Sequence, residues 1–121
     1  MNDDEILVVR TEDVEARIVV LTASGELDRD SVKFLTVAAD EALGRGRDRV
    51  VLDVGRVTFC DSSGLSFVVG LHRRTAATGG VLRVACAQGI VLTALQISNL
   101  DRLLHLDPTL EAAMRAVRAG E

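Results

Sequence analysis

Aromatic, sulfur and imidazole side chains are scarce in this chain of 121 residues, which has no tryptophan or tyrosine, three phenylalanines, two cysteines and two histidines. The core is therefore expected to be aliphatic, and no aromatic platform is available on which nucleic-acid bases would stack. Cys60 and Cys86 lie within or beside apolar segments and lack a metal-ligand spacing. We expect reduced, buried thiols at both positions and no metal site, with a redox pair as the alternative.

An excess of positive charge is also absent, because the formal net charge is -4. Nucleic acids and anionic membranes both bind concentrated positive surfaces, so neither is expected as a partner. Arg45, Arg47 and Arg49 form the densest basic cluster, but Gly46 and Asp48 interrupt it and Gly44 precedes it. This spacing is typical of a solvated turn.

The chain also lacks an apolar opening segment with a basic flank, since Asp3, Asp4 and Glu5 stand where a signal peptide is positively charged. No segment approaches the roughly 20 apolar residues of a membrane-spanning helix. We therefore expect a cytoplasmic protein. Its length predicts a single domain that covers residues 1–121.

Short segments rich in β-branched residues alternate with amphipathic segments along the chain. Residues 5–10 and 17–22 predict a hairpin whose connection is the polar segment 11–16. The sequence then predicts helices at about 31–43, 65–78 and 88–97 and after residue 107, with strands at 49–54, 81–86 and 102–106. This order predicts an α/β fold, in which a mixed sheet of four to five strands packs with about four helices.

Polar residues with short side chains precede two of these helices. Asp28, Asp30 or Ser31 is expected to cap the first predicted helix by accepting a backbone hydrogen bond. Asp107 is expected to cap the last helix, with Pro108 in the first helical position. Segment 55–60 is expected to be the connection between the strand at 49–54 and a further polar helix start at Asp61.

Asp61, Ser62, Ser63 and Gly64 form a small polar segment directly before an apolar helix. One interpretation makes Asp61 or Ser62 simply the N-cap of that helix. In the other, a phosphoryl group on Ser62 faces free N–H groups and the positive end of the helix dipole. Phosphorylation would then change the surface charge by about -2 with little effect on the fold, and its effect would fall on a partner.

Catalysis by Ser62 requires a base and a group that orients it. His72 lies ten positions further along the same predicted helix, about 15 Å away, and His105 is expected to pack within the last strand. Neither glycine-rich segment has the lysine and spacing of a phosphate-binding loop. We therefore expect a protein that is not an enzyme, without catalytic residues or a cofactor.

Residues 51–71, VLDVGRVTFCDSSGLSFVVGL, resemble the signature of the STAS family, and specifically of the bacterial anti-sigma factor antagonists. Residues 25–28, GELD, and 97–104, ISNLDRLL, are similar to two further family segments. The chain departs from the family pattern at Asn99, where many relatives have glycine, and at Cys60, where a larger aliphatic residue is usual.

The resemblance implies a STAS fold and a partner-switching function. In that family, the unphosphorylated protein captures an anti-sigma factor with a serine-kinase fold and so releases a sigma factor. Phosphorylation of the serine that corresponds to Ser62 breaks the complex, and a metal-dependent serine phosphatase restores it. Ser63 is the second candidate acceptor. The implied partner-binding residues are Asp28, Asp61, Ser62, Ser63, Gly64 and Leu65.

An alternative within the same family is a STAS module that is never phosphorylated and acts as a scaffold or a ligand-sensing adaptor. The two interpretations differ in what a negative charge at Ser62 does. A dianionic phosphate beside Asp61, and near Asp28 if the family's packing holds, would disrupt a close interface through charge burial.

Overall fold

The computed structural model describes residues 7–121. Asp3, Asp4 and Glu5, and residues 5–6 of the predicted first strand, lie outside the described residues. Within the described part of the chain, no helix is long and apolar enough to cross a membrane. No group of three or more potential metal ligands occurs among the same residues.

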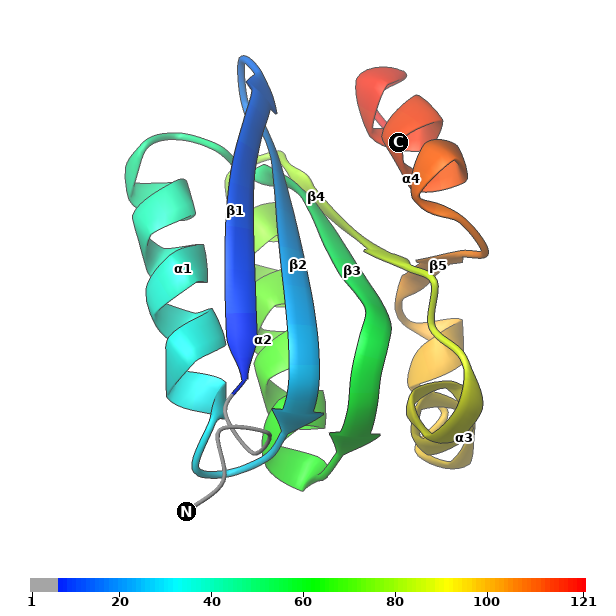
Figure 1. Cartoon of the computed structure of the whole chain (residues 1–121). Helices are drawn as coiled ribbons and strands as arrows, with labels where there is room; N and C mark the ends of the chain where they lie inside the picture. The colour runs from blue at the N-terminus through cyan, green and yellow to red at the C-terminus, as the bar shows by residue number, and fades with distance from the viewer. Residues whose placement is uncertain (1–6) are drawn as a thin grey trace.

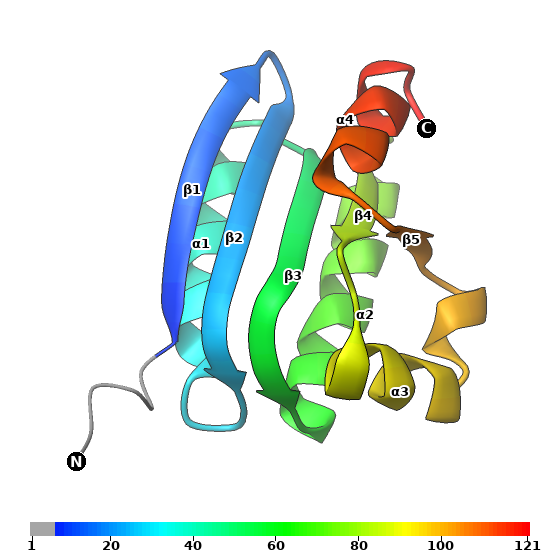
Figure 2. The same ribbon diagram turned by 45° about the vertical axis from the view of Figure 1, so that its right-hand side comes forward.

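A mixed sheet of five strands forms the centre of the molecule, in the order β1-β2-β3-β4-β5. β1 pairs with β2 in the antiparallel sense, and the other neighbouring strands are parallel. The predicted α/β fold with a mixed sheet is confirmed (Figure 2). The strands are β1 (Val8–Glu15), β2 (Ile18–Leu27), β3 (Arg49–Cys60), β4 (Val81–Ala85) and β5 (His105–Asp107).

Helices cover both faces of the sheet, but unequally. α1 and α2 lie side by side behind it, and α4 lies on the opposite face near one end (Figures 1 and 2). The helices are α1 (Val32–Gly44), α2 (Ser62–Ala77), α3 (Gly89–Ile97) and α4 (Leu110–Arg118), with a short 3-10 helix at Leu100–Arg102.

Two aliphatic cores result, because successive side chains of a strand point to opposite faces. In β2, Val19 and Leu21 enter the larger core beneath α1 and α2, whereas Ile18 and Val20 enter the smaller core beneath α4. α3 adds Val91 to the larger core. α4 is short, so the α4 side of the sheet is covered at only one end (Figure 2).

Two segments expected to be connections are strands instead. Residues 11–15 belong to β1, and the hairpin turn is the tight one around Arg17, which has a φ of 70°. Polar side chains are compatible with a strand here because β1 is an edge strand whose side chains are mostly exposed. Residues 55–60 continue β3 through register irregularities against β2.

The predicted N-cap of the last helix is wrong. Asp107 lies in β5, where its carboxylate accepts hydrogen bonds of 2.7 and 3.1 Å from Arg83 of β4. Thr109 caps α4 by accepting a 3.0 Å hydrogen bond from the Ala112 N–H. The last strand is also shorter than predicted and lies at 105–107, because residue 102 ends a 3-10 helix and residues 103–104 form a turn.

None of the three predicted residues caps α1 through its side chain: Ser31 stands at the N-cap position without a cap hydrogen bond, and Asp28 binds N–H groups that precede the helix. The Asp28 carboxylate accepts hydrogen bonds from the N–H groups of Asp30 and Ser31, at 3.0 and 2.9 Å. The Ser31 side chain makes no cap hydrogen bond to the helix and instead donates to the Glu26 carbonyl at 2.7 Å. The loop before α1 is therefore held by its own side chains.

The arginine cluster after α1 is ion-paired rather than only solvated. Arg45 and Arg47 both contact the Asp13 carboxylate, at 3.0 and 3.3 Å, and so connect this turn to β1. The two cysteines are free, as expected, but each is only partly buried. Burial, with a smaller effect of Asp61, raises the pKa of the Cys60 thiol to about 11.

Candidate partner-binding site

Asp61 supplies the N-cap of α2. Its backbone is extended, and its Oδ1 atom accepts hydrogen bonds from the N–H groups of Ser63 and Gly64, at 2.9 and 3.2 Å. These bonds satisfy two of the N–H groups that the first turn of a helix leaves unpaired. Ser62 is the first residue of α2, is exposed, and takes no part in the cap. Of the two residues considered for the cap, Asp61 holds it and Ser62 remains accessible.

The loop between β2 and α1 lies against this helix start. The Arg29 N–H donates a 3.2 Å hydrogen bond to Asp61 Oδ2, and the Asp61 N–H donates to the Leu27 carbonyl at 3.2 Å. Both segments are at the same end of the sheet, where β2 and β3 finish (Figure 2). One carboxylate thus binds the α2 terminus through one oxygen and the neighbouring loop through the other.

These two segments line a shallow hollow of about 410 Å³. It brings Asp28 close to Asp61, Ser62 and Ser63, as the resemblance implied. Three aspartates and one arginine therefore line the same hollow as the exposed serine. The residues that line the hollow are Asp28, Arg29, Asp30, Phe59, Asp61, Ser62 and Ser63.

Gly64 is buried, so its place among the predicted partner-binding residues is one of packing rather than contact. A Cβ atom there would lie 2.7 Å from Cys60 Sγ and 2.9 Å from Leu27 Cγ. The absence of a side chain lets the first turn of α2 pack against the ends of β2 and β3. The small Cys60 side chain occupies the space beside it.

Leu65 is partly buried and faces a second hollow, of about 320 Å³, between α2 and the 3-10 helix. Its lining is mostly apolar, with Val69 one turn further along α2 and Leu100 across from it. The first residue of α2 in this apolar groove is Leu65, three positions after Ser62. The predicted residues therefore divide between a charged hollow and an apolar groove.

Phe59 and Arg29 were missed by the sequence analysis. Phe59 is 41% exposed and lines the charged hollow, so it places an aromatic ring beside Ser62. The segment 55–60 was interpreted as a connection, which hid the fact that Phe59 lies in β3, opposite Glu26 of β2. Had the segment been recognised as a strand, the alternation of side chains would have placed Phe59 on the same face of β3 as the buried Val57.

The histidines lie away from this hollow. The ring centroids of His72 and His105 are 6.4 Å apart. His105 is exposed, so the expectation that it packs within the last strand is wrong, because β5 is short and lies at the edge of the sheet. Neither histidine is among the residues around Ser62.

The sequence of residues 6–113 matches the STAS domain family. This chain belongs to the STAS domain family. The strand, the Asp61 cap and the exposed serine described above all fall within the matched segment.

This STAS chain is a distant relative of proteins named as anti-sigma factor antagonists. A putative anti-sigma factor antagonist of Thermotoga maritima is 28% identical over 102 residues, which cover 84% of this chain and 90% of that protein. The anti-sigma F factor antagonist of Paenibacillus polymyxa is 28% identical over 90 residues, or 74% of this chain and 77% of that protein. These names describe regulators, in agreement with the expectation that the chain is not an enzyme.

Solved structures share the fold across nearly the whole STAS chain. An anti-sigma factor antagonist from Mycobacterium paratuberculosis superposes with a TM-score of 0.86 at 24% identity, covering 98% of this chain and 99% of that chain. The Bacillus cell fate determinant SpoIIAA in its phosphorylated form gives a TM-score of 0.72 at 27% identity, covering 92% of this chain and all of that chain.

Proposed function

We propose that this chain is an anti-sigma factor antagonist, a single cytoplasmic domain that works by binding a protein. Its partner is an anti-sigma factor with a serine-kinase fold, which it captures while Ser62 is unphosphorylated. The observation that carries the proposal is at the start of α2, where Asp61 caps the helix and Ser62 remains exposed. A phosphorylated structure of the relative SpoIIAA supports the same interpretation.

Phosphorylation of Ser62 is compatible with the fold for two reasons. The Ser62 hydroxyl makes no hydrogen bond within residues 7–121, so its modification removes no contact there. A phosphoryl group would also lie at the positive end of the α2 dipole. The switch should therefore leave the domain folded.

Phosphorylation would weaken partner binding through its negative charge. A phosphate of about -2 would join Asp28, Asp30 and Asp61 in one hollow, with only Arg29 to offset it. A partner that closely covers the neutral serine, Phe59 and the apolar groove would have to bury this charge. Loss of about 3 kcal/mol of binding free energy would weaken the complex more than a hundredfold. A metal-dependent serine phosphatase would then restore binding.

Incubation with the cognate kinase-fold partner, Mg²⁺ and ATP tests the proposal. Mass spectrometry should find one added phosphate at Ser62, none in Ser62→Ala, and normal modification in the matched control Ser63→Ala. Ser63 is partly buried, which makes it the poorer acceptor of the two. Continued phosphorylation of Ser62→Ala would contradict the assignment.

Binding measurements separate the switch from a constitutive STAS scaffold. The proposal predicts that Ser62→Ala retains the affinity for the kinase-fold partner and that Ser62→Asp reduces it strongly. Equal affinities of the two variants would favour the scaffold or ligand-sensing adaptor instead.

A further inference from the structure

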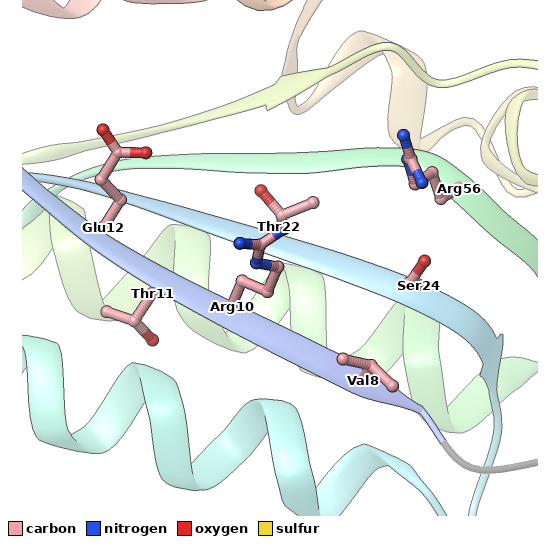
Figure 3. Close-up of a pocket in the computed structure, with 7 residues that line it drawn as sticks. All are labelled: Val8, Arg10, Thr11, Glu12, Thr22, Ser24 and Arg56. Atoms are coloured by element: carbon pink, nitrogen blue, oxygen red, sulfur yellow. The ribbon is translucent and has the colours of Figure 1, made fainter. Parts of the chain in front are cut away.

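β1 is an edge strand with a long open side. It contains eight residues, and among residues 7–121 no strand pairs with its outer edge. Such an edge presents unpaired N–H and C=O groups that another strand can bind. Figure 3 shows Val8, Arg10 and Glu12 projecting from one side of β1, over an open hollow of about 710 Å³, while Thr11 points to the other side.

We propose that two copies of this chain associate through the outer edges of β1. The two strands pair in the antiparallel sense about a two-fold axis at Thr11, and the two five-stranded sheets become one continuous sheet. This interface lies on β1 and is separate from the Ser62 hollow. The inference therefore goes beyond the proposed function and does not depend on it.

Charge selects this register. A two-fold axis perpendicular to the sheet pairs each residue with one whose side chain points to the same face. Side chains alternate between faces along a strand, so paired residues are an even number of positions apart in the sequence. The axis must therefore pass through a residue, and not between two residues. With the axis at Thr11, Arg10 of each copy lies directly opposite Glu12 of the other. Moving the axis to Arg10 would place two arginines opposite each other, and moving it to Glu12 would place two glutamates so. Opposite charges stabilise a cross-strand pair and like charges destabilise it.

Arg10 and Glu12 are available for this role. Neither side chain forms an ion pair within the described part of the chain, whereas the other two acidic residues of β1 are already paired: Asp13 with the turn after α1, and Glu15 with Arg118. Across β1–β2, the residues opposite Arg10 and Glu12 are the uncharged Thr22 and Val20. The charges of β1 that lack a partner in the monomer are thus the two that the proposed register pairs.

Apolar surface at the same rim supports a second copy as the occupant. Val8, the first residue of β1, is 53% exposed. Phe34 is 44% exposed on α1. Asp40 marks the α2 side of α1 by its 2.7 Å ion pair with Arg74, and Phe34 lies about 120° around the helix from it, on the flank away from α2. Dimerisation would therefore cover apolar side chains that the monomer exposes.

Charge reversal in the full chain tests the interface. Sedimentation velocity over a range of concentrations should show a reversible dimer of the unaltered protein. Arg10→Glu and Glu12→Arg should each weaken dimerisation about tenfold, because each substitution creates two like-charge pairs. The double variant Arg10→Glu/Glu12→Arg should restore it, since the pairs re-form with their signs exchanged. Arg102→Glu, an exposed charge reversal outside β1, is the matched control and should have no effect.

Three outcomes would overturn the inference. The first is an unaltered protein that remains monomeric up to about 1 mM, where a millimolar complex would be half formed. The second is a dimer that neither single reversal weakens. The third is a double variant no stronger than the single variants. Circular dichroism of each variant shows that it is folded, and because both side chains are exposed, loss of the fold is not expected.

Discussion

The residues next to Ser62 keep its hydroxyl exposed and allow the start of α2 to pack closely against the sheet. Asp61 takes the capping role, so Ser62 keeps its hydroxyl exposed. Gly64 takes up no space, so the helix start can approach Leu27 and Cys60 closely. The DSSG segment therefore combines one residue that caps, one that is exposed and one that packs.

Adding a methyl group to Gly64 should destabilise the fold. In Gly64→Ala the new Cβ would overlap with Cys60 Sγ and Leu27, and we expect a loss of about 1–3 kcal/mol in the free energy of unfolding. Gly70→Ala, in the same helix, meets no atom within 4 Å and should be neutral or stabilise by up to about 1 kcal/mol. Urea denaturation of both variants checks this. Equal stabilities would show that the close approach at Gly64 has no energetic consequence.

The functional site is built at the level of elements where β2 and β3 end side by side. β2 leads into the loop of Asp28, and β3 leads into the Asp61 cap of α2. The Arg29 N–H bonded to Asp61 connects the two junctions. The geometry of the site thus depends on two parallel strands and not on α2 alone.

Substitution of Asp61 separates the cap from the charge. Asp61→Ala removes the acceptor for two helix N–H groups and one loop N–H, and should lower the free energy of unfolding by about 0.5–2 kcal/mol. Asp61→Asn keeps an oxygen acceptor without the charge, so it should retain most of the stability. Thermal or urea denaturation of the pair measures the difference. An asparagine variant as unstable as the alanine variant would assign the effect to charge instead.

The sequence predicted these elements to different extents, for physical reasons. Residues 49–54 were predicted as a strand because a strand buried on both faces is aliphatic throughout. Residues 31–43 were predicted as a helix because a helix buried on one side has apolar residues at helical spacing. Residues 11–15 were not recognised, because an edge strand has no need of an alternating apolar face. Asp107 was misassigned because capping and pairing with Arg83 both suit an aspartate, and only the fold brings Arg83 near. Asn99 has a φ of 59°, in the left-handed region that asparagine and glycine adopt more readily than other residues.

At the scale of the whole molecule, the end of the sheet opposite Ser62 is held by a buried carboxylate. Asp48 precedes β3 and accepts hydrogen bonds of 2.8 and 2.9 Å from Arg17 in the hairpin turn and of 2.7 Å from Thr78 at the end of α2. These contacts join β1–β2, β3 and α2 in one place. The hydrogen bonds from Arg17 in particular lower the pKa of Asp48 below its usual value.

Acid should therefore weaken the molecule through Asp48. Because its pKa is lower in the folded state than in the unfolded state, its contribution is fully present above the ordinary pKa of an aspartate, about 4, and is lost as the pH falls below that value. Asp48→Asn should be less stable at neutral pH and should lose less stability between about pH 5 and pH 2 than the unaltered protein. Urea denaturation across that range measures both. Parallel pH profiles of the two proteins would contradict this role.

Because the Asp61 carboxylate binds both the start of α2 and the loop before α1, an amide signal from that loop should report on the state of Ser62. The Arg29 amide hydrogen is held by Asp61 Oδ2, on a different segment from Ser62. A phosphate that repels or displaces this carboxylate would change the chemical shift and the solvent exchange of the Arg29 amide. The phosphorylation state of the helix start would then be readable by NMR from a neighbouring loop, without a label on the serine itself.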